Sequence, residues 1–213
     1  IKQAESKPEH VIVFDREQNV EIPKQDYDVD YKTLVEKSPS VEAVSLPATH
    51  PSYILYTSGT TGKPKGIIRD TGGYATALKF SMKYVYGVDE GDTYWAASDV
   101  GWVVGHSYIV YAPLFNRNTT ILFEGKPIKT PDASTFWRVI SEHNVKVMFT
   151  APTAIRAIKK EDPNGHMIKR FDLSCLKYQF LAGERCDVAT LTWTHEKLNV
   201  PVIDHWWQTE SGW

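Results

Sequence analysis

The chain has 213 residues, of which 42% are hydrophobic, and a formal net charge of −2. Its 24 basic and 26 acidic side chains are interspersed, which argues against nucleic acid as a partner, and no apolar stretch reaches membrane-spanning length. Cys175 and Cys186 match no metal-binding spacing and are interpreted as reduced thiols of an intracellular protein. The chain begins without methionine or a signal peptide and stops abruptly at Trp213, so we expect a piece of a longer protein.

Strand and helix signals alternate from residue 51 onward, after a polar stretch in which one strand (11–14) and one helix (31–37) are predicted. Further strands are predicted over 52–56, 93–97, 119–123, 146–150, 178–181 and 200–203. Helices are predicted over 74–85, 103–114, 130–140, 154–160 and 187–198. Pro131 suits the first turn of its helix, and Asp187 suits an N-terminal cap. This alternation predicts an α/β layered fold with a mostly parallel sheet and flanking helices.

Three polar motifs follow predicted strands, over residues 57–66, 183–185 and 204–210. Ligands of open α/β sheets collect at the carboxyl ends of the strands. We therefore expect the three motifs to converge at one edge of the sheet.

The first motif reads TSGTTGKPKG and is rich in glycine, hydroxyl and lysine side chains. Glycines allow a close backbone approach, successive N–H groups form an anion-binding nest, and the lysines add positive charge. The motif predicts a phosphate-binding loop made of Thr57, Ser58, Gly59, Thr60, Thr61, Gly62, Lys63 and Lys65. It is not a Walker A loop, because the glycine spacing is too short and Pro64 follows Lys63. The alternative is a plain glycine-rich turn.

The motif at 204–210 combines two tryptophans with a carboxylate. Paired tryptophans at a strand end can wall an aromatic or apolar ligand, and a carboxylate beside a phosphate loop is a natural Mg²⁺ ligand. The alternative is that Trp206 and Trp207 are core residues and Glu210 is a solvated turn acid. Residues 99–107 also allow two interpretations. Their glycines would let a ligand approach the backbone closely, or the segment is the tightly packed start of a helix. In the motif at 183–185, Gly183 is expected to admit a flat ring against the backbone. The alternative is that Glu184 is only a surface acid.

Taken together, the strings at 57–66, 101–108, 150–156, 183–185 and 206–210 resemble the short-chain acyl-CoA synthetases. These are the acetyl- and propionyl-CoA ligases within the adenylate-forming superfamily. The resemblance extends from about residue 50 to the end and is weaker before it. It is strongest to the short-chain family member 3 type of animals, a mitochondrial propionate-CoA ligase. It implies that residues 1–213 form the central part of the AMP-binding N-terminal domain, that the mobile C-terminal domain lies outside this chain, and that the protein is in the mitochondrial matrix.

The resemblance also implies roles for single residues. The loop at 57–66 would hold the ATP β- and γ-phosphates, with Lys65 facing the triphosphate. The adenosine site would be formed by Gly183, Glu184, Arg185, Asp204, His205, Trp206, Trp207 and Gln208, with Thr209 at the α-phosphate and Glu210 binding Mg²⁺. The acyl pocket would be walled by Trp102, Val103, Val104, Ala182 and Trp207. Many relatives have proline in place of Arg185, and acetate enzymes often have threonine in place of Val104.

The implied chemistry uses ATP and Mg²⁺ to turn a small carboxylate into an acyl-adenylate, and then CoA to form the thioester. Ala182 is smaller than the valine of many acetate-selective relatives, which favours propionate over acetate. The alternative is a truncated, non-catalytic nucleotide-binding chain. A P-loop kinase or ATPase is disfavoured by the glycine spacing.

Overall fold

A computed structural model describes residues 3, 5–16, 24–59 and 62–213 of the chain. The chain divides into two compact units, residues 1–45 and 46–213. In the first unit, strand β1 (Val11–Val13) pairs in parallel with β2 (Asp28–Asp30), and helix α1 (Tyr31–Lys37) follows directly. Asp30 caps α1, since its side chain accepts a hydrogen bond from the Thr33 N–H at 2.8 Å. The predicted strand and helix of this unit are confirmed, whereas β2 was not predicted.

The second unit begins with an antiparallel hairpin of β3 (Pro51–Thr57) and β4 (Lys65–Asp70), followed by helix α2 (Thr71–Tyr84). The sequence indicated β3 and α2, but β4 was missed because it lies in the tail of the phosphate motif. Asp70 ends β4 and caps α2 by accepting from the N–H groups of Gly73 and Tyr74.

A five-stranded parallel sheet forms the centre of the second unit, in the order β6-β5-β7-β8-β9. The predicted α/β architecture is therefore confirmed. Its strands are β5 (Thr93–Ala96), β6 (Thr119–Thr120), β7 (Val145–Thr150), β8 (Tyr178–Leu181) and β9 (Val202–Asp204). The strand predicted over 119–123 is shorter than expected, since pairing ends at Thr120.

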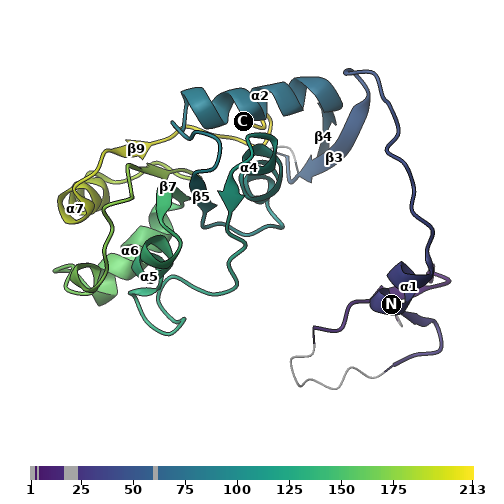
Figure 1. Ribbon diagram of the computed structural model, residues 1–213, viewed down its shortest axis with the longest axis horizontal. Coiled ribbons are helices and arrows are strands. Elements are labelled where there is room, and N and C mark those ends of the chain that lie inside the picture. Colours follow the sequence, from purple (N-terminus) through teal and green to yellow (C-terminus); the bar gives the residue numbers. More distant parts are fainter. Residues whose placement is uncertain (1–2, 4, 17–23, 60–61) are drawn as a thin grey trace. The chain divides into compact units, whose positions relative to one another are not determined.

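Helices cover both faces of the sheet (Figure 1). One face carries α5 (Thr135–Glu142), α6 (Pro152–Glu161) and α7 (Val188–Leu198), and a short 3₁₀ turn (Ile168–Arg170) lies beside them. The other face carries α2 and the helical segment that follows β5. The prediction for α7 is confirmed at both ends. Asp187 caps the start of the helix by accepting from the Thr190 N–H at 2.8 Å, and the helix ends at Leu198.

The helix predicted over 103–114 is present but is not a regular α-helix. It runs as α3 (Val103–Gly105), a π-helical stretch (His106–Tyr111) and α4 (Ala112–Phe115). Pro113 lacks the N–H that would bond to the Ile109 carbonyl in an α-helix, and that carbonyl accepts from Thr120 Oγ1 at 2.7 Å instead. The proline thus contributes to the irregular hydrogen bonding of this segment.

The prediction that Pro131 lies in the first turn of a helix is wrong. Helix α5 begins at Thr135, and Pro131 lies in the preceding loop after a cis peptide bond. Hydrogen bonds hold a separate turn there: Asp132 Oδ1 accepts from the Ser134 N–H, and Thr135 Oγ1 donates to the Asp132 carbonyl. These bonds delay the start of the helix.

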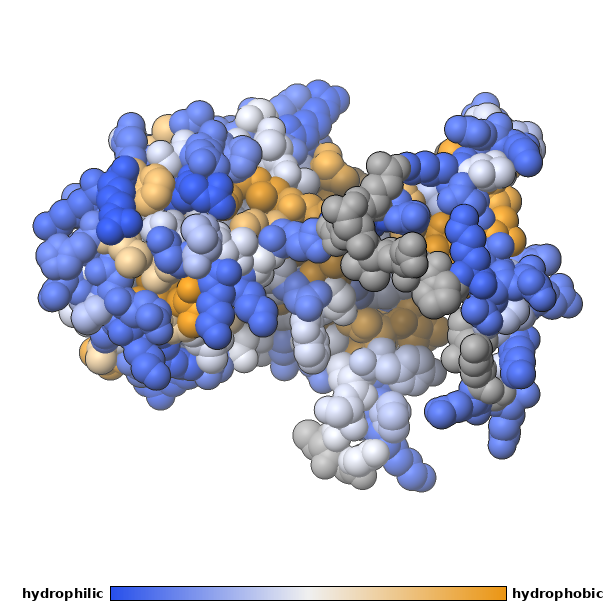
Figure 2. All heavy atoms as spheres, turned by 90° about the horizontal axis from the view of Figure 1, so that it is seen from below, coloured by the Kyte–Doolittle hydropathy of each residue, from blue (hydrophilic) through white to orange (hydrophobic). Residues whose placement is uncertain are grey.

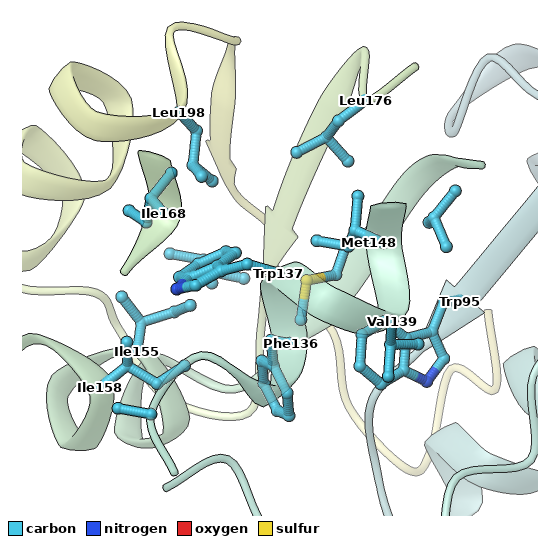
Figure 3. Packing of buried hydrophobic residues seen from close by; sticks show 14 of the residues in the cluster. Trp95, Phe136, Trp137, Val139, Met148, Ile155, Ile158, Ile168, Leu176 and Leu198 are labelled. Atoms are coloured by element: carbon cyan, nitrogen blue, oxygen red, sulfur yellow. The ribbon is translucent and has the colours of Figure 1, made fainter. Parts of the chain in front are cut away.

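Alternate residues of the strands face two separate hydrophobic cores. We call the first the α5–α7 core; it contains Trp95, Met148 and Leu181 from the strands, and Figure 3 shows Trp137 at its centre. We call the second the α2 core; its strand members are Tyr94, Ala96, Val147, Phe149 and Phe180, and Ala182, directly after β8, also belongs to it. On the face of the second unit that Figure 2 shows at its left, hydrophilic residues predominate, with hydrophobic residues in patches between them.

Candidate functional site

The carboxyl ends of the parallel strands open into two cavities. The larger has a volume of about 440 Å³ and is lined by Ser98, Trp102, Val103, Val104, Phe149, Thr150, Ala151, Ala182, Gly183, Trp207, Gln208, Thr209 and Glu210. The smaller, about 360 Å³, is lined by Gly183, Glu184, Arg185, Asp204, His205, Trp206 and Trp207. Both volumes are typical of small-molecule sites. Gly183 and Trp207 line both cavities, so the two adjoin at these residues.

The larger cavity brings together every residue predicted to wall an acyl group. Trp102, Val103 and Val104 come from the start of the helical segment after β5, Ala182 follows β8, and Trp207 follows β9. The apolar walls meet a polar side made by Gln208, Thr209 and Glu210. Ser98 and Thr150 also line this cavity, although the sequence gave no separate reason to single them out.

Residues after β9 alternate between the two sides of an extended segment. His205, Trp207 and Thr209 are partly buried, whereas Trp206, Gln208 and Glu210 are exposed. Trp207 packs against the α2 core, and Trp206 is 71% exposed. The reading of both tryptophans as core residues is therefore wrong for Trp206, because a strand-like segment turns neighbouring side chains to opposite sides.

Gly183 lines the smaller cavity with exposed backbone and no side chain. Its φ is +103°, a backbone conformation that residues with a Cβ rarely adopt. A Cβ built on Gly183 would meet no atom within 4 Å, so the space beside its backbone is open. The flat ring that the sequence analysis predicted beside Gly183 would find room at this open backbone.

His205 lines the smaller cavity from an aromatic environment. Its ring lies 5.6 Å from Tyr86, 6.0 Å from Phe149 and 5.7 Å from Phe180, in edge-to-face arrangements. Its Nε2 is 3.2 Å from the Tyr86 hydroxyl. Burial lowers the pKa of His205 below its ordinary value of 6.5, because the charged imidazolium loses hydration. The neutral ring therefore predominates at neutral pH.

Glu184 is held in place by an arginine that the sequence analysis had not assigned. Arg156, on α6, donates to Glu184 Oε1 and, at 3.2 Å, to Asp187 Oδ2. Asp204 Oδ1 accepts from the Cys186 N–H at 3.2 Å, which joins the end of β9 to the segment between β8 and α7. Arg185 is exposed at the cavity rim. The string at 150–156 contained Arg156, but only the fold shows which carboxylates it reaches.

The predicted phosphate loop joins the two strands of the β3–β4 hairpin. Thr60 and Thr61 lie outside the described residues; Thr57 and Gly59 are partly buried, and Ser58, Gly62, Lys63 and Lys65 are exposed. Gly59 has a φ of +64°, and a Cβ there would lie 2.2 Å from the Lys63 carbonyl oxygen, so the turn requires glycine. Two of the three motifs thus converge on the cavities, whereas none of the described loop residues lines either of them.

Nothing in the described ranges forms a group of three or more His, Cys, Asp or Glu side chains suited to a metal ion. Mg²⁺ does not need such a cage, since it is often held by one or two carboxylates together with phosphate oxygens and water. Glu210, exposed at the larger cavity, fits that kind of binding beside a nucleotide. Among the described helices, none has the length and apolarity needed to cross a membrane.

Comparison with known proteins agrees with this arrangement. Residues 1–213 match the family of AMP-binding enzymes, and the chain belongs to that family. It is 51% identical over 213 residues to the acyl-CoA synthetase short-chain family member 3, mitochondrial, of Homo sapiens, covering 100% of this chain and 31% of that protein. It is 48% identical over 215 residues to the propionate–CoA ligase of Salmonella typhimurium, covering 100% of this chain and 34% of that protein. The chain thus spans about a third of the length of these relatives.

Proposed function

We propose that the protein containing this chain is an AMP-forming short-chain carboxylate–CoA ligase that prefers propionate. Membership of the AMP-binding enzymes supports the reaction class, and the names of the relatives from Homo sapiens and Salmonella typhimurium support the acyl-CoA product. The mitochondrial designation of the human relative supports a location in the mitochondrial matrix.

The observation that carries the proposal is the larger cavity. Its apolar walls, Trp102, Val103, Val104 and Ala182, face a polar side that holds Thr209 and Glu210. A short acid bound there would place its alkyl chain against the walls and its carboxylate toward the polar side. The adjoining smaller cavity would hold the adenine ring, so the α-phosphate of the nucleotide would lie between the two.

In the proposed reaction, a carboxylate oxygen attacks the α-phosphorus of ATP, and the bond from that phosphorus to the bridging oxygen breaks. Pyrophosphate leaves with the bond electrons, and an acyl-adenylate remains. The thiol of CoA then attacks the acyl carbon, loses its proton, and releases AMP. Bound Mg²⁺ would supply charge neutralisation at the phosphate oxygens.

The residues of this chain would bind and orient the reactants. Backbone N–H groups of the loop, with Lys63 and Lys65, would hold the β- and γ-phosphates. Thr209 would donate to the α-phosphate, and Glu210 would hold the metal ion. Catalysis in the first step then depends on positioning and electrostatic stabilisation rather than on a covalent side-chain nucleophile.

Carboxylate-dependent exchange of pyrophosphate into ATP tests the proposal, because it isolates the first step. The full-length protein should catalyse the exchange with propionate, and Lys65→Ala and Glu210→Gln should each lower it, by about 10²–10³-fold if each acts as a transition-state contact. Lys79→Ala is the matched control, since Lys79 is an exposed lysine of α2 that lines neither cavity. ATP binding without any pyrophosphate exchange would contradict the ligase and favour a non-catalytic nucleotide-binding protein.

A further inference from the structure

Arg69 is a buried arginine that joins the hairpin to the segment after β9. It lies near the end of β4, where Ile67 and Arg69 point inward and the neighbouring residues are exposed. Only 8% of Arg69 is exposed. Its Nη1 donates to the Glu210 carbonyl oxygen at 2.9 Å, and its Nη2 donates to the Thr209 carbonyl oxygen. One guanidinium therefore holds the main chain of the two residues proposed to face the α-phosphate and the metal ion.

The surroundings of Arg69 are built to receive the guanidinium. Its Cζ lies 5.9 Å from the centre of the Tyr74 ring on α2. On the other side, a Cβ at Gly212 would lie 2.6 Å from Arg69 Cζ, so the absence of a side chain at Gly212 leaves room for the arginine. The Arg69 side chain thus lies close to both the α2 helix and the segment that it holds.

A chain of hydroxyl groups reinforces the same attachment. Ser107 Oγ donates to the Gly212 carbonyl at 2.8 Å and lies 2.6 Å from the Tyr74 hydroxyl. The Tyr53 hydroxyl of β3 donates in turn to that of Tyr74 at 3.2 Å. Residues 209–212 are therefore held directly by Arg69 of the hairpin and Ser107 of the π-helical stretch, and Tyr74 of α2 supports Ser107.

Charge and geometry both favour arginine at this position. A buried cation is costly unless its donors are satisfied. Here two carbonyl oxygens accept from Nη1 and Nη2, and the guanidinium lies over the Tyr74 ring, whereas Nε is buried without a hydrogen-bond partner among the described residues. The planar guanidinium presents donors in a fixed fork that reaches two neighbouring carbonyls together, whereas a lysine has a single ammonium group on a flexible stem. Lysine would therefore keep the charge but hold the two carbonyls less firmly.

We infer that Arg69 is a positioning residue, which fixes the main chain of Thr209 and Glu210 relative to the strand that carries Lys65. Lys65 begins β4 and Arg69 is near its end, so one strand links the phosphate loop to the main chain of Glu210. Arg69 lines neither the larger nor the smaller cavity, which distinguishes it from the residues proposed to touch ligands. The role in nucleotide use rests on the proposed function, whereas the attachment itself does not.

The test uses the full-length protein with Arg69→Met and Arg69→Lys. Two controls accompany them: Arg138→Met removes a half-exposed arginine that pairs with Glu142 on α5, and Ile158→Val destabilises the distant α5–α7 core mildly. The first readout is hydrogen exchange of residues 205–213 in the ligand-free protein. The second is the dependence of pyrophosphate exchange on ATP and Mg²⁺ concentration, with thermal unfolding measured on the same samples.

Arg69→Met should speed hydrogen exchange at 205–213 selectively and lower kcat/KM for ATP by about tenfold to a hundredfold, because a displacement of about 1 Å can cost that much. It should also raise the Mg²⁺ concentration needed for half-maximal rate, and Arg69→Lys should be intermediate in all three. The controls should change none of them, even where Ile158→Val lowers the melting temperature.

Unchanged hydrogen exchange at 205–213 in both Arg69 variants would overturn the attachment. Faster hydrogen exchange at 205–213, combined with an unaltered dependence of pyrophosphate exchange on ATP and Mg²⁺, would overturn the role of Arg69 in the nucleotide site. If the unsubstituted protein shows no pyrophosphate exchange, the proposed function fails, but hydrogen exchange still decides whether Arg69 holds residues 205–213.

Discussion

The two cores of the second unit lie on opposite faces of one sheet and differ in chemistry. The buried members of the α5–α7 core include no tyrosine among the described residues, and none of them lines either cavity. The α2 core buries Tyr74, Tyr86, Tyr94 and Tyr108 and reaches the larger cavity through Phe149 and Ala182. The first face therefore mainly stabilises the fold, whereas the second also supports the candidate site with polar contacts.

Hydroxyl partners show how the α2 core performs this second task. The Tyr86 hydroxyl meets His205 Nε2, and the Tyr108 hydroxyl lies 3.0 Å from Ser81 Oγ. Burial raises the pKa of Tyr86, Tyr94 and Tyr108, so these hydroxyls remain neutral. The neutral Tyr86 hydroxyl therefore orients His205, a residue of the smaller cavity, without adding a buried charge.

The largest expected effect on stability comes from Trp137→Ala in the α5–α7 core. Trp137 is fully buried, and truncating such a tryptophan costs about 3–5 kcal/mol. The matched variant is Trp206→Ala, because Trp206 is 71% exposed and should change the unfolding free energy by less than about 0.5 kcal/mol. Urea unfolding measures both. A similar loss for the two tryptophans would remove the distinction between core and cavity wall.

Tyr86→Phe and Tyr94→Phe form a sharper pair within the α2 core. Both tyrosines are fully buried, but the Tyr86 hydroxyl meets His205, whereas the Tyr94 hydroxyl has no hydrogen-bond partner among the described residues. Tyr86→Phe should cost about 0.5–1.5 kcal/mol, and Tyr94→Phe should be neutral or stabilising. Equal costs, measured by urea unfolding, would mean that the contact with His205 contributes nothing to stability.

His205 should make stability depend on pH. Since burial lowers its pKa in the folded protein, the unfolded chain binds the proton more readily. Stability should therefore be complete above about pH 6.5 and fall as the pH drops below that value toward the folded pKa. His205→Phe, which keeps an aromatic ring, should flatten this dependence relative to the unsubstituted protein. Parallel curves for the two proteins between pH 7 and pH 5 would exclude His205 as the source.

A small stability effect is expected at Arg156, whose ion pairs with Glu184 and Asp187 are partly exposed. Arg156→Met should cost no more than about 1 kcal/mol, as should the control Arg138→Met. The two should differ in ATP use, because only Arg156 contacts a residue of the smaller cavity. A raised KM for ATP in Arg156→Met alone is the expected result. Equal KM values in the two variants would contradict the assignment of Glu184 to the adenine site.

Local signals predicted much of this fold, because they depend on neighbouring residues. The cap at Asp187 and the apolar run of β8 needed no distant contact to be recognised. Strand β4 was missed because its pairing with β3 is set by the hairpin. The π-helical stretch was missed because it depends on Pro113 together with a hydroxyl from Thr120.

The candidate site also contains some features that the sequence predicted and others that only the fold reveals. The resemblance named most of the residues that line the two cavities, but not Ser98 or Phe149. It did not identify the partners of Arg69 or Arg156, because those contacts join residues far apart in the chain. The role of the phosphate loop stays a prediction, because its described residues line neither cavity. The role of Glu210 also stays a prediction, although Glu210 lines the larger cavity.

The most direct test of the acyl-site assignment is kcat/KM for propionate and acetate in the full-length protein and in Ala182→Val. Ala182 lines the larger cavity, and valine there would occupy space that one more methylene of the substrate needs. The unsubstituted protein should favour propionate, and Ala182→Val should shift the ratio toward acetate by about tenfold to two-hundredfold. An unsubstituted protein that prefers acetate, or a ratio that Ala182→Val leaves unchanged, would contradict the assignment of this cavity to the acyl group.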